Sequence, residues 1–249
     1  MRFIEYGRKN KNVIVFVHGS CTTAETCYSE IIKVLRKKYC CVLCRLDGHD
    51  TNRKSDFVSI ERETLKIENY VKGRFDGKIL AFVGLSLGSA ICVNIMSRGE
   101  VKAEKIFLDS VYCIDKGFWY AWLTYLTCYA GIFYIRNGGR VPEKITEKFF
   151  GKGNRSVTDM LYSGISSKSV KNICLDVYRY KIRANVSLCE SEILCIRGGY
   201  DPVSAQSVDL LRMYLPDLKE KVIENCGHAQ FLNEHVQEYI LMLDDFLKK

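Results

Sequence analysis

The stretch GLSLG places Ser86 between two glycines, Gly84 and Gly88. Apolar runs precede and follow this stretch, so the serine lies where a strand is expected to turn into a helix. In so tight a turn, glycines avoid collisions with the neighbouring strand and helix. The serine hydroxyl then stands clear of the sheet, beside the free N–H groups of the helix N-terminus. This arrangement is a nucleophile elbow, and it makes Ser86 a candidate nucleophile.

A serine hydroxyl becomes a strong nucleophile when a histidine takes its proton and a carboxylate orients that histidine. His228, in IENCGHAQF, follows the last expected strand and precedes the last expected helix. Asp201, in ILCIRGGYDPVSA, lies in the loop after the strand before that one. Because the carboxyl ends of parallel strands share one edge of a sheet, these residues are expected to meet there. The sequence therefore predicts a Ser-His-Asp triad.

Other acids and histidines fit these roles less well. Asp109, in IFLDS, also ends an expected strand and is the alternative acid; otherwise we expect it to cap the start of the segment that follows. His235 is expected to lie exposed on the last helix. His18 and His49 precede the elbow and belong to other motifs.

Short apolar strands alternate with helices along most of the chain. The expected strands cover residues 13–17, 40–46, 79–83, 106–108, 193–196 and 222–223. The expected helices cover residues 25–38, 57–73, about 86 to 96, 203–214 and 231–247. This alternation predicts an α/β fold, with a mostly parallel sheet covered by helices on both faces.

The composition indicates a soluble protein with a substantial core, since 47% of the 249 residues are apolar and 27% are charged. The first residues do not form a secretory signal, so we expect a cytoplasmic protein with reduced thiols. Cys41 and Cys44 form a C-x-x-C, but residues three apart on a strand point to opposite faces. No metal site is therefore expected, and most of the twelve cysteines should be buried as small apolar residues.

Together these stretches resemble the α/β-hydrolase superfamily over nearly the whole chain. VFVHGS is similar to the family's strand-end HG motif, which implies that the backbone N–H of Ser20, next to Cys21, is an oxyanion donor. The resemblance implies that the N–H of Leu87, directly after the nucleophile, is the second donor. RLDGHD is similar to the D-x-P-G-H-G stretch, without its proline and last glycine. The implied mechanism passes through an acyl-enzyme and needs no metal or organic cofactor.

The alternation of strands and helices breaks between Asp109 and Ile193. We therefore expect an α/β-hydrolase core of residues 1–110 and 191–249, interrupted by a helical cap at residues 111–190. The cap contains an uncharged run, residues 117–135, that is long enough to span a membrane. Spanning is not expected, because its tyrosines favour membrane interfaces and because a span would separate Ser86 from the other two triad residues.

One face of the cap is expected to carry aromatic side chains at steps of four, three and four residues, namely Phe118, Trp122, Tyr125 and Tyr129. This face either packs on the core or walls an apolar acyl pocket beside Ser86, and the two roles are compatible. The residues expected in such a pocket are Trp122, Tyr125 and Cys21.

Positive charge gathers in the second half of the cap. Residues 136–186 contain 11 lysines and arginines against 4 aspartates and glutamates, a net +7 in a chain of net +8. A solvated basic face would account for this, as would steering of an anionic substrate or docking on an anionic membrane surface. No nucleic-acid-binding motif accompanies the charge, so nucleic acid is not an expected partner.

The sequence leaves more than one class of function open. An intact triad favours a serine hydrolase that cleaves a carboxylic ester or thioester with an apolar acyl group, as a carboxylesterase, lipase or thioesterase does. An acyltransferase would use the same triad. The alternative from another class is a non-catalytic ligand-binding protein on the same fold, which would not need all three groups.

Overall fold

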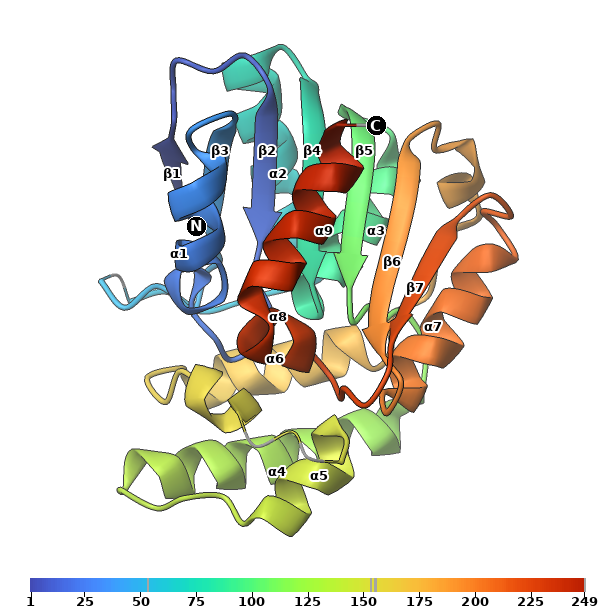
Figure 1. Ribbon diagram of the computed structural model, residues 1–249. Helices are drawn as coiled ribbons and strands as arrows, with labels where there is room; N and C mark the ends of the chain where they lie inside the picture. The colour runs from blue at the N-terminus through green and yellow to red at the C-terminus, as the bar shows by residue number, and fades with distance from the viewer. Residues whose placement is uncertain (53, 153, 155, 249) are drawn as a thin grey trace.

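A seven-stranded sheet forms the centre of the molecule (Figure 1). The computed structural model describes residues 1–52, 54–152, 154 and 156–248. The strand order is β1-β3-β2-β4-β5-β6-β7; β1 runs antiparallel to β3, and the other described pairs are parallel. The strands are β1 (Arg2–Tyr6), β2 (Val13–Val17), β3 (Cys40–Arg45), β4 (Lys78–Leu85), β5 (Lys102–Asp109), β6 (Glu192–Gly198) and β7 (Lys219–Ile223).

Helices cover both faces of the sheet, as predicted. One face packs against α1, α8 and α9, and the other against α2, α3 and α7. The bounds of these helices are α1 (Ala24–Leu35), α2 (Ile60–Phe75), α3 (Leu87–Arg98), α7 (Pro202–Arg212), α8 (Gln230–Glu234) and α9 (Val236–Lys248). The predicted α/β fold with a mostly parallel sheet is confirmed.

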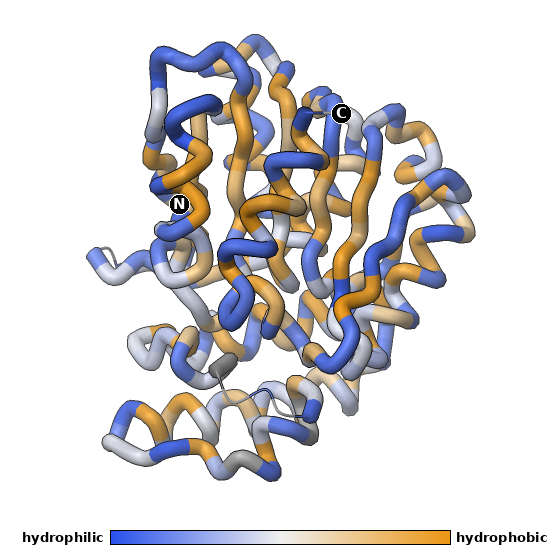
Figure 2. Tube along the Cα trace, viewed as in Figure 1, coloured by the Kyte–Doolittle hydropathy of each residue, from blue (hydrophilic) through white to orange (hydrophobic). Residues whose placement is uncertain are grey.

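The core is divided between the two faces of the sheet. All five residues of β2 are buried; Ile14 and Phe16 pack toward α1 and α9, whereas Val15 and Val17 pack toward α2 and α3. A strand covered on both faces needs apolar residues at every position, which VIVFV supplies. Burying each such side chain contributes roughly 1.5–3 kcal/mol. In Figure 2 the central strands are largely orange, whereas the helices around them carry both apolar and polar segments.

The C-x-x-C cysteines follow the same alternation. Cys41 packs on the side of α1 and α9, and Cys44 packs on the opposite side, as predicted. All twelve cysteines of the chain are free, and ten of them are buried. Within the described residues, no group of three or more histidines, cysteines or acids is placed to hold a metal ion.

Two elements differ from the sequence prediction, while the others are confirmed with shifted ends. Strand β1 was not predicted, because its five half-buried residues lie at the edge of the sheet and lack a continuous apolar run. The helix predicted over residues 231–247 is two helices, since the backbone at His235 leaves the helical region (φ −122°, ψ 43°). No glycine or proline marks this break. His235 is exposed, as expected.

A covering layer of helices lies beyond the carboxyl ends of the strands (Figure 1). It consists of α4 (Phe118–Arg136), α5 (Glu143–Phe150), the 3-10 helix η1 (Ser156–Met160) and α6 (Ser167–Val177). A second 3-10 helix, η2 (Ala184–Leu188), packs against α3. All of these elements come from the insertion between β5 and β6, and the division of the chain at residues 111–190 remains a prediction.

Helix α4 covers the uncharged run and carries the predicted aromatic face. Its ring centroids follow one another at 6.2, 5.4 and 6.1 Å, along the row Phe118, Trp122, Tyr125 and Tyr129. Across the described part of the chain, α4 included, no helix combines the length and apolar character needed to cross a membrane.

Candidate active site

The predicted nucleophile elbow lies between β4 and α3. Ser86 has φ 52° and ψ −110°, a sparsely populated backbone conformation that costs energy for a residue with a side chain. A Cβ atom on Gly88 would lie 1.9 Å from the carbonyl oxygen of Val17, and one on Gly84 would lie 2.7 Å from the backbone nitrogen of Ser89. Both positions therefore require glycine, and the turn that they permit carries Ser86 at the carboxyl edge of the sheet.

The structure brings together the three residues predicted as a triad. Nε2 of His228 lies 2.9 Å from Oγ of Ser86, and Nδ1 of His228 lies 2.6 Å from Oδ2 of Asp201. Asp201 precedes α7, and its Oδ1 accepts a hydrogen bond of 3.0 Å from the N–H of Ser204. The Ser86, His228 and Asp201 residues are 7%, 6% and 2% exposed. In this geometry Nδ1 donates to the carboxylate, which leaves Nε2 to accept the serine proton.

Hydrogen bonds between its backbone and other segments of the chain hold the loop that carries His228. Its N–H donates to the carbonyl oxygen of Phe150 at 2.7 Å, and its carbonyl oxygen accepts from Nδ2 of Asn154 at 2.7 Å. The next residue, Ala229, has φ 58° and donates its N–H to Oγ of Ser110 at 3.0 Å. The imidazole is therefore held by its backbone as well as by its two ring nitrogens.

Asp109, the alternative acid, lies close to this network but has a different partner. Its Oδ1 accepts a hydrogen bond of 2.8 Å from Oγ of Ser110, whereas the ring of His228 donates to Asp201 and not to Asp109. Burial raises the pKa of Asp109 to about 7. The expectation that Asp109 caps the next segment is wrong, because α4 starts nine residues later, after Gly117, and the Asp109 carboxyl group is buried.

The two predicted oxyanion donors, Ser20 and Leu87, lie on adjoining segments. Gly88, the second residue of α3, packs against the carbonyl oxygens of Val17 and His18, so the loop after β2 adjoins the start of this helix. The first N–H groups of a helix have no partner within it. Among the described residues, neither the N–H of Ser20 nor that of Leu87 donates a hydrogen bond. Their role at an oxyanion remains a prediction.

A buried histidine holds the loop that carries Ser20. Nε2 of His49 accepts a hydrogen bond of 3.1 Å from the N–H of Cys21, and its Nδ1 lies 3.0 Å from the carbonyl oxygen of Asp47. Nε2 must be bare to accept, so the proton is on Nδ1 and the ring is neutral. Burial lowers the pKa of His49 to about 4, which favours this neutral form.

His18 likewise links two loops through both of its ring nitrogens. Its Nε2 accepts a hydrogen bond of 3.2 Å from the N–H of Leu46, and its Nδ1 lies 2.8 Å from the carbonyl oxygen of Gly19. Burial lowers the pKa of His18 to about 3. The two imidazoles meet edge to face at 5.1 Å. The sequence analysis did not predict that these histidines position the loop; the only sign was that His18 lies in VFVHGS and His49 in RLDGHD.

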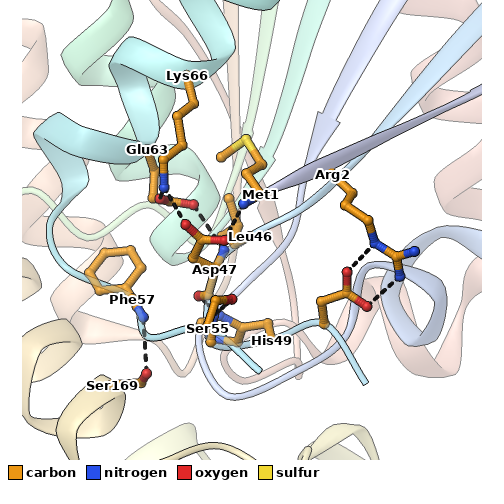
Figure 3. A network of polar contacts seen from close by, with 12 residues as sticks. Met1, Arg2, Leu46, Asp47, His49, Ser55, Phe57, Glu63, Lys66 and Ser169 are labelled. Carbon is orange, nitrogen blue, oxygen red and sulfur yellow. Dashed lines mark hydrogen bonds and ion pairs between the residues drawn. The ribbon is translucent and has the colours of Figure 1, made fainter. Parts of the chain in front are cut away.

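The loop of residues 46–50 is itself anchored by charge (Figure 3). Asp47 contacts both the amino group of Met1 and Nζ of Lys66, and its N–H donates to Oε2 of Glu63 at 3.0 Å. The N–H of Gly48 donates to Oγ of Ser55 at 3.2 Å. These contacts hold a loop that lacks the proline and last glycine of the stretch that it resembles.

The predicted pocket residues lie in or against the covering layer. Trp122 is half-buried, with Nζ of Lys171 5.1 Å from the centre of its ring. The hydroxyl of Tyr125 lies 3.0 Å from Oγ of Ser167, at the start of α6. Cys21 is buried, and its carbonyl oxygen accepts a hydrogen bond of 2.7 Å from Tyr162. None of these contacts involves Ser86, and the pocket assignment remains a prediction.

Aromatic rings that the sequence did not identify lie near His228. The ring centroid of Tyr112 is 4.7 Å from that of His228, and the centroid of Phe150 is 6.2 Å from it. Phe150 and Asn154 belong to the insertion, far from His228 along the chain, so no local pattern reveals their contacts. Ser110 could have been considered from the sequence, because it directly follows Asp109 at the end of a strand, where site residues gather.

Two surface hollows lie at the opposite, amino-terminal edge of the sheet. Their volumes are ≈ 470 and ≈ 530 Å³, and both are lined in part by Glu190 and Ser191. Neither is lined by Ser86 or His228. Neither hollow therefore opens onto the candidate triad.

Comparisons with known proteins agree with this architecture. No protein-family model and no curated protein matches the sequence. Among solved structures, a protein from Desulfitobacterium hafniense assigned to the alpha/beta hydrolase family is similar with a TM-score of 0.86 at 22% identity, covering 99% of this chain and 100% of that one.

Two further structures extend the comparison. MenH from S. aureus is similar with a TM-score of 0.73 at 18% identity, covering 99% of this chain and 97% of that one. An esterase from Exiguobacterium antarcticum is similar with a TM-score of 0.76 at 16% identity, covering 99% of this chain and 95% of that one. At identities this low the likeness concerns the fold: the chain has the α/β-hydrolase fold that its motifs predicted.

Proposed function

We propose that this protein is a serine hydrolase that cleaves a carboxylic ester or thioester with an apolar acyl group. Ser86 attacks the acyl carbonyl carbon, Nε2 of His228 takes the serine proton, and Asp201 stabilises the imidazolium that forms. The observation that carries the proposal is the continuous contact from Ser86 through His228 to Asp201, with distances of 2.9 and 2.6 Å, on a strained elbow.

The backbone N–H groups of Ser20 and Leu87 would hold the oxyanion of the tetrahedral intermediate. Removing one such donor typically lowers turnover about 10²–10³-fold. His228 then returns its proton to the leaving alcohol or thiol, which leaves the acyl group on Ser86. Water, deprotonated by the same Nε2, releases the acid and restores the serine.

The surroundings of His228 support an apolar acyl group. The rings of Tyr112 and Phe150 lie near the imidazole, and Ser86 is 7% exposed under the covering layer. Four similar solved structures carry esterase or carboxylesterase in their titles, which favours an ester substrate as a first choice. Ester, thioester and acyl-transfer activities all begin with the same attack by Ser86, and they differ in the leaving group and the acceptor.

A fluorophosphonate probe tests whether the serine is activated. We expect an adduct on Ser86, located by mass spectrometry, and none in Ser86→Ala. Asp201→Asn should lower turnover of an aryl ester about 10³–10⁴-fold, because the wrong imidazole tautomer would be held. Asp109→Asn is the matched control and should retain activity within about tenfold. An unlabelled folded wild type would instead support the ligand-binding alternative, and a larger effect of Asp109→Asn would reassign the acid.

A further inference from the structure

The outer face of α4 is apolar although it is exposed. Four large side chains at spacings of four, three and seven residues lie 47% to 79% exposed on it: Trp119, Leu123, Leu126 and Phe133. Thr127, on the same face, turns its hydroxyl back to the carbonyl oxygen of Thr124 at 3.0 Å. No charged residue occurs from position 117 to 135, and the exposed polar groups of this part of the helix include the hydroxyls of Tyr120 and Tyr134, which are 43% and 53% exposed.

The inner face of the same helix is already covered by this chain. Ala121, Thr124 and Ile132 are buried, and α4 packs along α6. A helix that is apolar on all sides is normally buried completely or lies in a membrane. Figure 2 shows apolar segments of α4 at the lower edge of the molecule, away from the sheet. Its outer face is therefore a surface without a partner in the described part of the chain.

Cations lie beyond the C-terminal end of α4. Residues 136–152 contain five lysines and arginines against two glutamates. Arg136 donates to the carbonyl oxygens of Ser163 and Ile165, which fixes its guanidinium without neutralising the charge. Arg140 and Lys144 are exposed.

Cations also flank the N-terminal part of the helix. The guanidinium of Arg179 lies 5.7 Å from the centre of the Phe118 ring, and Nζ of Lys171 lies 5.1 Å from the centre of the Trp122 ring. An exposed apolar face with tryptophan and tyrosine, bordered by cations at both ends, combines the two features of helices that lie in a membrane interface.

A second copy of this chain fits the face poorly. Pairing two molecules through α4 would bring the cations beyond the end of one helix, among them Arg140 and Lys144, toward those of the other molecule. A bilayer with anionic headgroups fits both features, because apolar side chains enter the boundary below the headgroups while lysines and arginines meet phosphates.

We propose that the outer face of α4 docks this protein on an anionic phospholipid bilayer, with the helix lying in the plane of the interface. This binding goes beyond the proposed hydrolase function and does not depend on it. Because α4 belongs to the covering layer, docking would turn this layer toward the bilayer. The next helix of the layer, α5, ends at Phe150, whose carbonyl oxygen accepts the hydrogen bond from the N–H of His228.

Vesicle flotation with the full chain tests the proposal. We expect binding to vesicles of phosphatidylcholine with about 30% phosphatidylserine to be at least about tenfold tighter than to phosphatidylcholine alone, and to weaken as salt rises from about 0.05 to 0.5 M. The chain has two tryptophans, so Trp122→Phe leaves Trp119 as the only one. Its emission should shift to shorter wavelength on binding and be quenched by brominated lipid.

Two matched variants separate the α4 face from general surface effects. Leu123 and Leu241, on α4 and α9, are 62% and 69% exposed, so Asp at either position should be tolerated in the fold. Leu123→Asp should weaken vesicle binding at least about tenfold, and Leu241→Asp should leave it unchanged. Thermal unfolding checks that both variants are folded, and hydrolysis of a water-soluble aryl ester reports the proposed function separately.

Three results would overturn the docking proposal. The first is no binding to anionic vesicles at low salt, and the second is equal weakening by Leu123→Asp and Leu241→Asp. The third is self-association that Leu123→Asp abolishes, in a protein that does not bind vesicles, which would make the face a dimer interface.

Discussion

Replacing Asp109 by asparagine tests how burial controls a carboxyl group beside the candidate site. The Asp109 residue is 2% exposed; its Oδ1 accepts from Ser110, and the hydroxyl of Tyr239 is close enough to lower the pKa of its carboxyl group against the larger effect of burial. Loss of solvent disfavours the carboxylate and raises the pKa from its ordinary 3.8 to about 7. Asparagine keeps the shape and the acceptor for Ser110 but cannot ionise.

The sign of the pH effect follows from linkage. A carboxyl group whose pKa is raised by folding binds its proton more tightly in the folded state, so its contribution is fully present below about pH 3.8 and is lost as pH rises through about 7. The rise in the pKa of Asp109 from 3.8 to about 7 corresponds to about 4 kcal/mol in full, of which about 2–3 kcal/mol is lost between about pH 5 and pH 8. As pH rises from about 5 to 8, the free energy of unfolding of the wild type minus that of Asp109→Asn should fall by about 2–3 kcal/mol.

Denaturant unfolding of both proteins at about pH 5, 6.5 and 8 measures this difference, and other titrating groups cancel because the two chains share them. Asparagine places a buried amide group where the wild type has a carboxyl group, so we expect the variant to be less stable than the wild type at about pH 5. The change of this difference with pH is what tests the reasoning. A difference that stays constant within about 0.5 kcal/mol across this range would show that Asp109 does not titrate there.

Three further substitutions probe the site from other sides. Gly88→Ala would place a Cβ 1.9 Å from the carbonyl oxygen of Val17, and we expect a loss of about 3 kcal/mol or more in unfolding free energy, measured by denaturant, or no soluble protein. Asn154→Ala would leave the buried carbonyl of His228 without its donor, so stability should fall by about 1–3 kcal/mol and turnover about tenfold, while KM changes less. If Trp122 walls an acyl pocket, specificity constants should rise with acyl length by up to about 0.8 kcal/mol per methylene, and Trp122→Ala should flatten that rise; a wild-type preference for acetyl esters would refute the pocket.

The sequence predicted those parts of the site that depend on strand ends. Ser86, Asp201 and His228 each follow a strand of a parallel sheet, so chain order and the rule that strands end at one edge were enough to place them together. Gly88 was predictable for the same local reason, since the elbow requires close approach of α3 to β2. The elements of the sheet were predictable because buried strands are continuously apolar.

The parts that were missed depend on contacts between distant segments. Phe150 and Asn154 reach His228 only once the insertion has folded over the sheet, and no spacing in the sequence encodes that contact. His49 carries no local sign that its Nε2 accepts from Cys21. Asp109 was misjudged because a residue at a strand end was assumed to lead directly into a helix, whereas eight residues separate it from α4.

The two halves of the candidate site are held by different parts of the chain. Ser86 stands on an elbow whose Gly88 packs directly on β2, so the core of the sheet fixes its position. His228, in contrast, has its N–H and its carbonyl oxygen bonded to Phe150 and Asn154 of the insertion. A displacement of the covering layer would therefore remove two hydrogen bonds from the histidine loop and leave the serine in place. For that reason, substitutions in the insertion such as Asn154→Ala should disturb the position of His228 more than that of Ser86.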